Sequence, residues 1–530
     1  STTALQSLGT DALQALATAQ VRALSTNQLR ALDSTQIQAL TAVQIRALSS
    51  TQVRGLTTDQ IGALSTDQIL SLASTQVVGL STSQIRALEI QDVTAMGTTQ
   101  LRGLSTTQLR ALTTDQIAAL GEASLIGLTS TQVASLTTTQ TDALTTAQFA
   151  NLGSTQVRGL TTLQIAAMSS EDLEALGEAG FAALTTTQLA SLSTTVVQAL
   201  TTTALSGFTT TQIRSLATTQ VRSLTTSQIE SLSPNQIRSL TTTQLGVLGT
   251  DLIAALTTDQ VPSLTSTQLS SLTTSQIRAV ETTDLILIGT SQLRGLTTTQ
   301  IAALTTDQVG ELSAVSVGAL TSTQIRGLTT AHIAVLDSDQ LASLSSIQIA
   351  ALSTTQLLAI DQTNLATLQG TQLRGLSSSQ IAGLSTTQVA ALSVAALPQL
   401  ITQQIQGFGT AQVAALTTDQ VAALLPGQVA SLSTTQVGAL ETTDIAALTA
   451  GQVVALGTAQ LLALADTQIA ALETTDLAAL TSGQIRALTT TQLGGLGSTQ
   501  IAGLTSGQVA SLTTTQIGAL TTTQIGALTT

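Results

Sequence analysis

The chain has 530 residues, of which 16 are basic and 29 are acidic, so its formal net charge is −13. This balance argues against nucleic acid as a partner and against an anionic membrane surface, because both require basic protein surfaces. The chain has no cysteine, which excludes disulfides and thiol chemistry. Thr and Gln interrupt the apolar residues too often for a run long enough to insert into a bilayer.

The chain from residue 1 onward is one eight-residue unit repeated sixty-six times, with the consensus T-T-x-Q-[IVL]-x-[AGS]-L. A strict short period predicts a one-dimensional repeat architecture, so we expect one continuous array over residues 1–530. Substitutions that recur every 192 residues, such as Asp92, Asp284 and Asp476, indicate a duplicated block of higher order. Leu occupies the eighth position throughout, except at Met96, Met168, Phe208, Val280, Ile288, Ile360 and Phe408.

Each octad contains a complete signal for the start of a helix. Ser or Thr at position 1 and Gln at position 4 form a capping box, and the apolar residues at positions 8 and 5 match the hydrophobic staple. Near the end of the chain, this assigns Thr513 to the N-cap, Gln516 to the third helical position, and Ile517 and Leu520 to the core. We therefore predict an all-α solenoid of very short capped helices, one per octad, which depend on their neighbours for stability.

The alternative fold is a β-solenoid with ladders of Thr and Gln, as in ice-binding repeats. The pattern favours helices, because positions 5 and 8 point to opposite faces of a strand. Pro262 and Pro398, at position 6, count against the helical interpretation. Thirteen of the sixteen octads without Gln at position 4 are even-numbered, which favours two octads per turn, although four would fit equally well.

Few side chains suggest chemistry. His332 is the only histidine and occupies the Gln position, where we expect it to act as a polar cap. Some octads place Glu at position 1 and Asp at position 4; a helix N-terminus accommodates such carboxylates, and a calcium clip between turns is the alternative. The calcium candidates are Glu281, Asp284, Glu441, Asp444, Glu473 and Asp476.

All sixteen basic residues are Arg, and all lie at position 6, which we assign to the solvent face of the helix. They confer solubility, or they contact acidic octads on a neighbouring coil, since Arg pairs well with carboxylates. Candidates for such contacts are Arg22, Arg54, Arg86, Arg294 and Arg326. No phosphate-binding loop, nucleophile with a base, or zinc spacing is present, so we expect neither an enzyme nor a cofactor.

The run L-T-T-x-Q-[IV]-x-A-L, as in Leu296–Leu304 and Leu512–Leu520, resembles the octapeptide arrays of very large secreted or surface proteins of proteobacteria, which are adhesin-like or filament-forming. This resemblance implies an extracellular or cell-surface structural role. We expect a self-associating filament, as in a biofilm matrix or an appendage, with cell-surface or matrix components as further partners. The alternatives are a stalk that presents a distant binding domain and an ice-binding β-solenoid.

Overall fold

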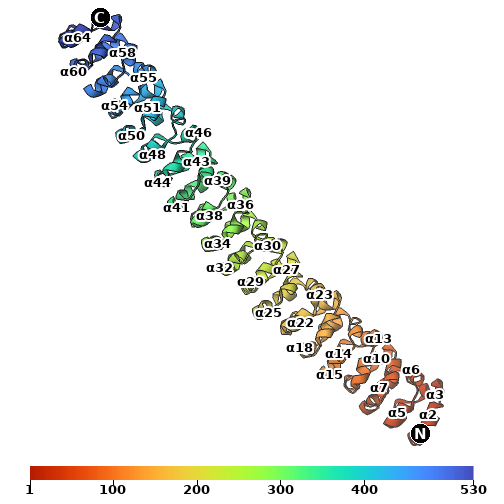
Figure 1. Cartoon of the computed structure of the whole chain (residues 1–530). Helices are drawn as coiled ribbons and strands as arrows, with labels where there is room; N and C mark the ends of the chain where they lie inside the picture. Colours follow the sequence, from red (N-terminus) through yellow and green to blue (C-terminus); the bar gives the residue numbers. More distant parts are fainter. Residues whose placement is uncertain (529–530) are drawn as a thin grey trace. The chain divides into compact units, whose positions relative to one another are not determined.

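The computed structural model describes residues 1–528, and the chain divides into two compact units, Ser1–Ser263 and Leu264–Thr530. Both units are stacks of short helices (Figure 1). Each of the sixty-six octads in residues 1–528 forms one helical element, and sixty-four of these are α-helices. The prediction of an all-α array of short helices is confirmed. The β-solenoid alternative is wrong, because no strand occurs in the described residues.

The octad sets the bounds of every helix. An α-helix begins at the second residue and ends between the fifth and the seventh, as in α5 (Ser34–Ala39) and α6 (Ala42–Ala47). One helix, α23 (Gly177–Ala183), begins at the first residue instead. The helices that end at the fifth residue are α16 (Glu122–Leu125), α35 (Thr282–Leu285), α45 (Gln362–Leu365), α46 (Gly370–Leu373) and α49 (Thr402–Ile405).

Two extended residues redirect the chain between helices. At the junction of α5 and α6, Leu40 has φ −62° and ψ 136°, and the N-cap Thr41 has φ −70° and ψ 157°. Repeating similar torsions at each junction turns the chain by a similar angle, which generates a superhelix. The junction before α23 differs, since Leu176 is helical and Gly177 has φ +65°, a conformation that favours glycine.

The four prolines divide into two pairs. Pro234 and Pro426 are the first residues of α30 (Pro234–Ser239) and α52 (Pro426–Ser431), the helical position that tolerates proline best. Pro262 and Pro398 lie at position 6, where a helix needs the N–H that proline lacks. These two octads form short 3₁₀ segments instead, η1 (Val261–Ser263) and η2 (Leu397–Gln399).

Within each unit, helices pack chiefly against the elements three octads before and three octads after them. In the first unit, α6 contacts α3 (Thr18–Ala23) and α9 (Thr66–Ser71); in the second, α40 (Ser322–Gly327) contacts α37 (Thr298–Ala303) and α43 (Ser346–Ala351). A superhelical turn therefore holds between three and four octads, and the prediction of two octads per turn is wrong. The 192-residue block holds an even number of octads, so duplication copies the parity of each substitution and the thirteen even-numbered octads are not independent observations.

The core is a thin aliphatic column within each unit. Position 5 is fully enclosed and position 8 nearly so, as shown by Ile45 at 0% and Leu48 at 3% exposed. Small residues at position 7 allow the turns to approach closely: a Cβ on Gly159 would lie 2.7 Å from Cα of Ser130, twenty-nine residues earlier. Among the described residues, no helix has the length and apolarity needed to span a membrane.

Candidate functional site

The glutamine at position 4 caps its own helix. In α11 (Thr82–Arg86), the Gln84 side-chain oxygen accepts a hydrogen bond from the backbone N–H of Ser81 at 2.8 Å. The Ser81 hydroxyl in turn accepts from the backbone N–H of Gln84 at 3.3 Å. This reciprocal pair is the capping box that the sequence predicts, and it satisfies two of the amide groups that a helix N-terminus leaves unpaired.

The same side chain also joins its helix to the previous turn. The Nε2 group of Gln84 donates to the carbonyls of Leu56 at 2.8 Å, Val53 at 3.0 Å and Arg54 at 3.3 Å. These carbonyls lie at and just beyond the end of α7 (Ser50–Gly55), where a helix leaves its acceptors without partners. The bond to Leu56 spans 28 residues, or about three and a half octads, and it recurs in both units.

This second bond is missing from the sequence-based prediction, although the sequence holds a signal for it. A Glu at position 4 would serve the capping box as well as Gln. Gln nevertheless occupies fifty of the sixty-six octads and Glu occupies none. A carboxylate can only accept, whereas the amide of Gln accepts from its own N-cap and also donates to another turn. The series of these bonds, from position 4 to the carbonyl 28 residues earlier, is called the glutamine ladder below.

The last octads follow the same plan. Gln516 accepts from the Thr513 amide at 2.9 Å, and its Nε2 donates to Leu488 O at 2.8 Å. Leu520 is buried, as predicted, whereas Ile517 is 45% exposed because no later turn packs on it within the described residues.

His332 replaces Gln in α41 (Thr330–Ala334) and makes both kinds of bond. Its Nδ1 accepts from the backbone N–H of Thr329 at 3.2 Å, so the proton of the neutral ring lies on Nε2, 2.8 Å from Leu304 O. Burial lowers the pKa of His332, and the Leu304 carbonyl opposes that shift. The predicted role as a cap is confirmed, and neutral histidine here reproduces the donor and acceptor of Gln.

Aspartate, which brings no donor when it is ionised, replaces Gln in five octads and is buried in four of them. Asp92 is 0% exposed and accepts from the Thr66 hydroxyl at 2.8 Å, while its Oδ2 is buried without a hydrogen-bond partner. Asp444 accepts from the Thr418 hydroxyl at 3.3 Å and from the Glu441 amide at 3.2 Å. Loss of solvation is the largest cause that raises the pKa of each of these carboxyls, and a neighbouring Glu adds to it.

The three predicted calcium pairs share one arrangement. In each pair the Asp is buried at 2–4% exposure and the Glu at the N-cap is exposed, so the two carboxylates lie in different surroundings. Burial raises the pKa of Asp284 and Asp476 as well, chiefly through desolvation. No group of three or more His, Cys, Asp or Glu that could hold a metal occurs in the described residues. Calcium binding stays a prediction. The pairs are Glu281 with Asp284, Glu441 with Asp444, and Glu473 with Asp476.

The arginines lie on the solvent face, and some of them reach the next turn of their own unit. Arg86 Nε donates to Ala111 O at 3.1 Å, and Arg294 Nε donates to Ala319 O at 2.7 Å, each twenty-five residues ahead. Arg22, Arg54 and Arg326 are exposed. Contact between these arginines and a neighbouring coil stays a prediction.

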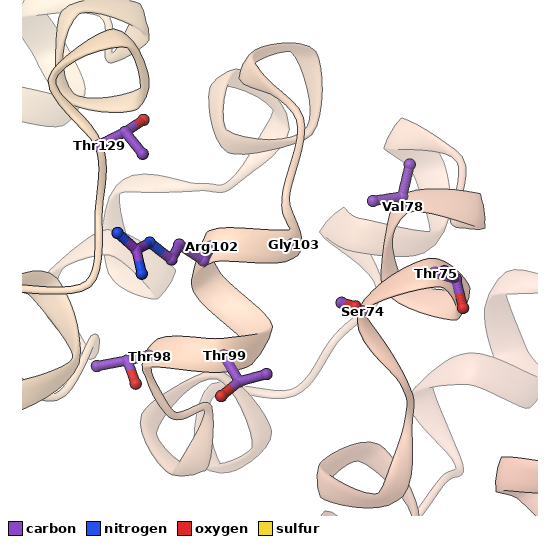
Figure 2. A pocket seen from close by; sticks show the side chains of 8 residues that line it. All are labelled: Ser74, Thr75, Val78, Thr98, Thr99, Arg102, Gly103 and Thr129. Atoms are coloured by element: carbon purple, nitrogen blue, oxygen red, sulfur yellow. The ribbon is translucent and has the colours of Figure 1, made fainter.

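Three surface grooves lie in or next to octads that lack Gln at position 4. A groove of about 820 Å³ crosses α10 (Ser74–Gly79) and α13 (Thr98–Gly103), close to the octads that carry Asp92 and Ser124 at position 4. Figure 2 shows the Arg102 guanidinium between Thr98 and Thr129, with Val78 at the other end. A second groove of about 670 Å³ includes Glu89, and a third, of about 790 Å³, includes Asn364, another residue in the Gln position.

Comparison with known proteins identifies the repeat. The ALTTAQ repeat matches more than half of the chain, in eleven segments. The chain belongs to the ALTTAQ repeat family. The matched segments are residues 16–50, 43–74, 85–122, 165–202, 228–258, 277–314, 317–346, 395–426, 437–474, 469–506 and 502–530.

Other comparisons add little. No curated protein matches the chain. The solved structure named "Structure of APUM23-GGAUUUGACGG" is 12% identical over 95% of this chain and 88% of that chain, with a TM-score of 0.15. The one named "Structure of APUM23-GGAAUUGACGG" is also 12% identical, over 100% and 92%, with a TM-score of 0.12. These TM-scores are too low to carry an argument.

Proposed function

We propose that this ALTTAQ repeat protein is a structural element that extends by stacking identical turns and associates with further copies into a filament outside the cell. The glutamine ladder carries this proposal. One bond type joins turn to turn within each unit at a spacing of 28 residues, as in Gln36 with Leu8 O in the first unit and Gln524 with Leu496 O in the second. A protein built in this way presents length and repeated surface, which suit a matrix or an appendage.

The first and last turns of the described residues display the groups that are covered wherever a further turn of the array packs on them. Ile517 and Ile525 are 45% and 46% exposed, whereas the corresponding Ile485 is 0% exposed beneath a following turn. At the other side, Gln20 and Gln28 cap their own helices through Oε1, and their Nε2 groups have no partner within residues 1–528. Between consecutive turns, such apolar side chains are buried and such Nε2 groups donate hydrogen bonds to carbonyls. Both groups therefore belong to the interface that joins one turn to the next.

Light scattering and electron microscopy of the purified 530-residue chain test the proposal. Wild type should form end-to-end polymers whose length rises with concentration. The double variant Ile517→Lys with Ile525→Lys should shorten them, because it places charge on the apolar surface. A Val43→Lys control, at a side chain 67% exposed on the side of a turn, should not. Wild type that stays monomeric at every concentration would contradict the filament and favour the stalk of an adhesin.

A further inference from the structure

At Asp92 the glutamine ladder lacks its donor, and two hydrogen-bond acceptors are left without a partner. Asp92 lies at the third position of α12 (Ile90–Ala95), where Gln would donate to the carbonyl 28 residues earlier, that of Leu64. The equivalent carbonyls of Leu56 and Leu80 each receive a Gln Nε2 at 2.8 Å. Within residues 1–528, no hydrogen bond reaches Leu64 O, and Asp92 Oδ2 has no partner. Burying two unpaired acceptors costs free energy that one shared proton would recover.

A side chain of this length reaches the previous turn. Asn364 has the same shape as aspartate and occupies the same position of its octad, and its Nδ2 donates to Leu336 O at 3.0 Å, 28 residues earlier. The Asp92 carboxyl already points toward the previous turn, because its Oδ1 accepts from the Thr66 hydroxyl, two residues after Leu64. A proton on Oδ2 would therefore place an O–H donor where Asn364 places its N–H.

The charges around Asp92 disfavour its ionised form. α12 packs against α9 and α15 (Thr114–Ala118), and the turn that carries Leu64 begins with α8 (Thr58–Gly62). The charged side chains of these three helices and of the N-cap of α12 are all carboxylates. The nearby guanidinium of Arg86, on α11, donates to Ala111 O through its Nε. Desolvation is the main cause that raises the pKa of Asp92. The Thr66 hydroxyl and the Glu89 backbone oppose that shift, the charge of Glu89 adds to it, and the pKa stays raised on balance. The charged groups are Asp59, Asp67, Asp115, Glu89 and Arg86.

We infer that Asp92 is a proton-dependent joint: its carboxyl stays protonated in the folded array over a pH range in which exposed carboxyls are ionised, and Oδ2–H donates to Leu64 O. Ionisation removes that bond and leaves a buried charge against carbonyl oxygens. A carboxyl whose pKa is raised on folding contributes stability that is complete below its unfolded pKa and is lost as the pH rises through its folded pKa. The array therefore loosens at this turn as the medium becomes less acidic.

Native-state hydrogen exchange across residues 56–104, followed against pH and corrected for intrinsic rates, tests the inference. In wild type, the opening constant of this turn should rise by up to about tenfold per pH unit, the slope for one released proton, and then level off. Asp92→Asn, which keeps an N–H donor at every pH, should remove this rise. Asp115→Asn changes an exposed carboxylate in the neighbouring α15 and should leave the rise intact.

Infrared spectroscopy detects the proton directly. The difference spectrum of wild type minus Asp92→Asn should show the C=O stretch of a protonated carboxyl at pH values where exposed carboxyls are ionised. Identical pH profiles for wild type and Asp92→Asn, or a carboxylate band alone in that spectrum, would overturn the inference. Added Ca²⁺ could instead restore protection from exchange at high pH in wild type but not in Asp92→Asn. That result would show a metal ion in place of the proton and would also overturn the inference.

Discussion

Two neighbouring helices of the first unit, α11 and α12, differ at one position and show which bond the array depends on. Gln84 in α11 accepts from its own N-cap and donates to Leu56 O of the previous turn. Asp92 in α12 is equally buried but brings no donor when ionised, and Leu64 O stays unpaired. Both octads still form helices of ordinary length. The local helix therefore tolerates a change at position 4, and the cost falls on the junction between turns.

The largest loss of stability should come from replacing the Gln84 amide, which donates to the previous turn, with a carboxylate, as at Asp92. Gln84→Glu has the same shape but places a carboxylate against the carbonyls of Leu56 and Val53. Removing a buried donor and leaving a charge should destabilise this turn by about 3 kcal/mol at neutral pH, and by less in acid. Hydrogen exchange of residues 50–90 measures the change. Gln84→Asn is the matched control, and if it loses as much protection as Gln84→Glu, the charge is not the cause.

A smaller loss of stability should follow from a substitution that forces two neighbouring turns apart. Gly159→Ala at the end of α20 (Ser154–Gly159) brings a Cβ within 2.9 Å of the Ser130 side chain and should cost about 2 kcal/mol by crowding. Gly246 in α31 (Thr242–Gly246) has no atom within 4 Å of an added Cβ. Gly246→Ala should therefore stabilise the array by about 0.5 kcal/mol. Chemical denaturation compares the two, and equal effects would show that turn spacing is not tightly fixed.

Restoring a missing bond of the glutamine ladder should raise the stability modestly. Asp444→Gln in α54 (Thr442–Ala446) replaces a buried carboxylate with an amide that can donate to Leu416 O, 28 residues earlier. The gain should be about 1 kcal/mol at neutral pH, the net value of one internal hydrogen bond. It should shrink in acid, where the aspartate is protonated. Thermal unfolding at two pH values measures it, and a lower midpoint for the variant would count against the ladder.

The smallest effect should be the acid response of His332. Burial lowers its folded pKa below the unfolded value of about 6.5, so its contribution is complete above that value and is lost as the pH falls toward the folded pKa. Protonation places a hydrogen on Nδ1 and breaks the bond from Thr329. This turn should loosen in acid while the turn at Asp92 tightens. Hydrogen exchange at both turns shows the contrast, and His332→Gln should abolish it at α41.

The sequence predicts the local fold well because the signals for each helix lie within eight residues. The N-cap, the third helical position and the staple are all short-range, as are the prolines that begin α30 and α52. The number of octads per turn is a different kind of quantity, since it depends on the small angle added at every junction. Neither the torsions of Leu40 and Thr41 nor the reach of Gln84 Nε2 follows from composition or period.

The candidate sites were harder to predict for the same reason. Sequence reasoning placed His332 correctly as a cap, because its role is local. For Glu441 and Asp444 the sequence leaves a helix N-terminus and a calcium clip as alternatives, and it does not show that only Asp444 is buried, because burial depends on the neighbouring turn. Arg86 is exposed, as its position in the octad predicts, and the bond from its Nε to Ala111 O depends on the neighbouring turn of its own unit.

The most direct test of the turn spacing is a cross-link at the predicted register. The chain has no cysteine, so introduced pairs report without background. A Cβ on Gly327 in α40 would lie 3.3 Å from Cβ of Thr298 in α37, close to the separation in a disulfide. The variant Gly327→Cys with Thr298→Cys should therefore oxidise rapidly and keep its helical content.

Two control pairs represent the competing registers. Gly327→Cys with Thr306→Cys, at the start of α38 (Thr306–Gly310), matches two octads per turn, and Gly327→Cys with Thr290→Cys, at the start of α36 (Thr290–Gly295), matches four. Both should stay reduced under mild oxidation. Rapid closure of either control, with Gly327→Cys and Thr298→Cys remaining open, would contradict the register of the glutamine ladder.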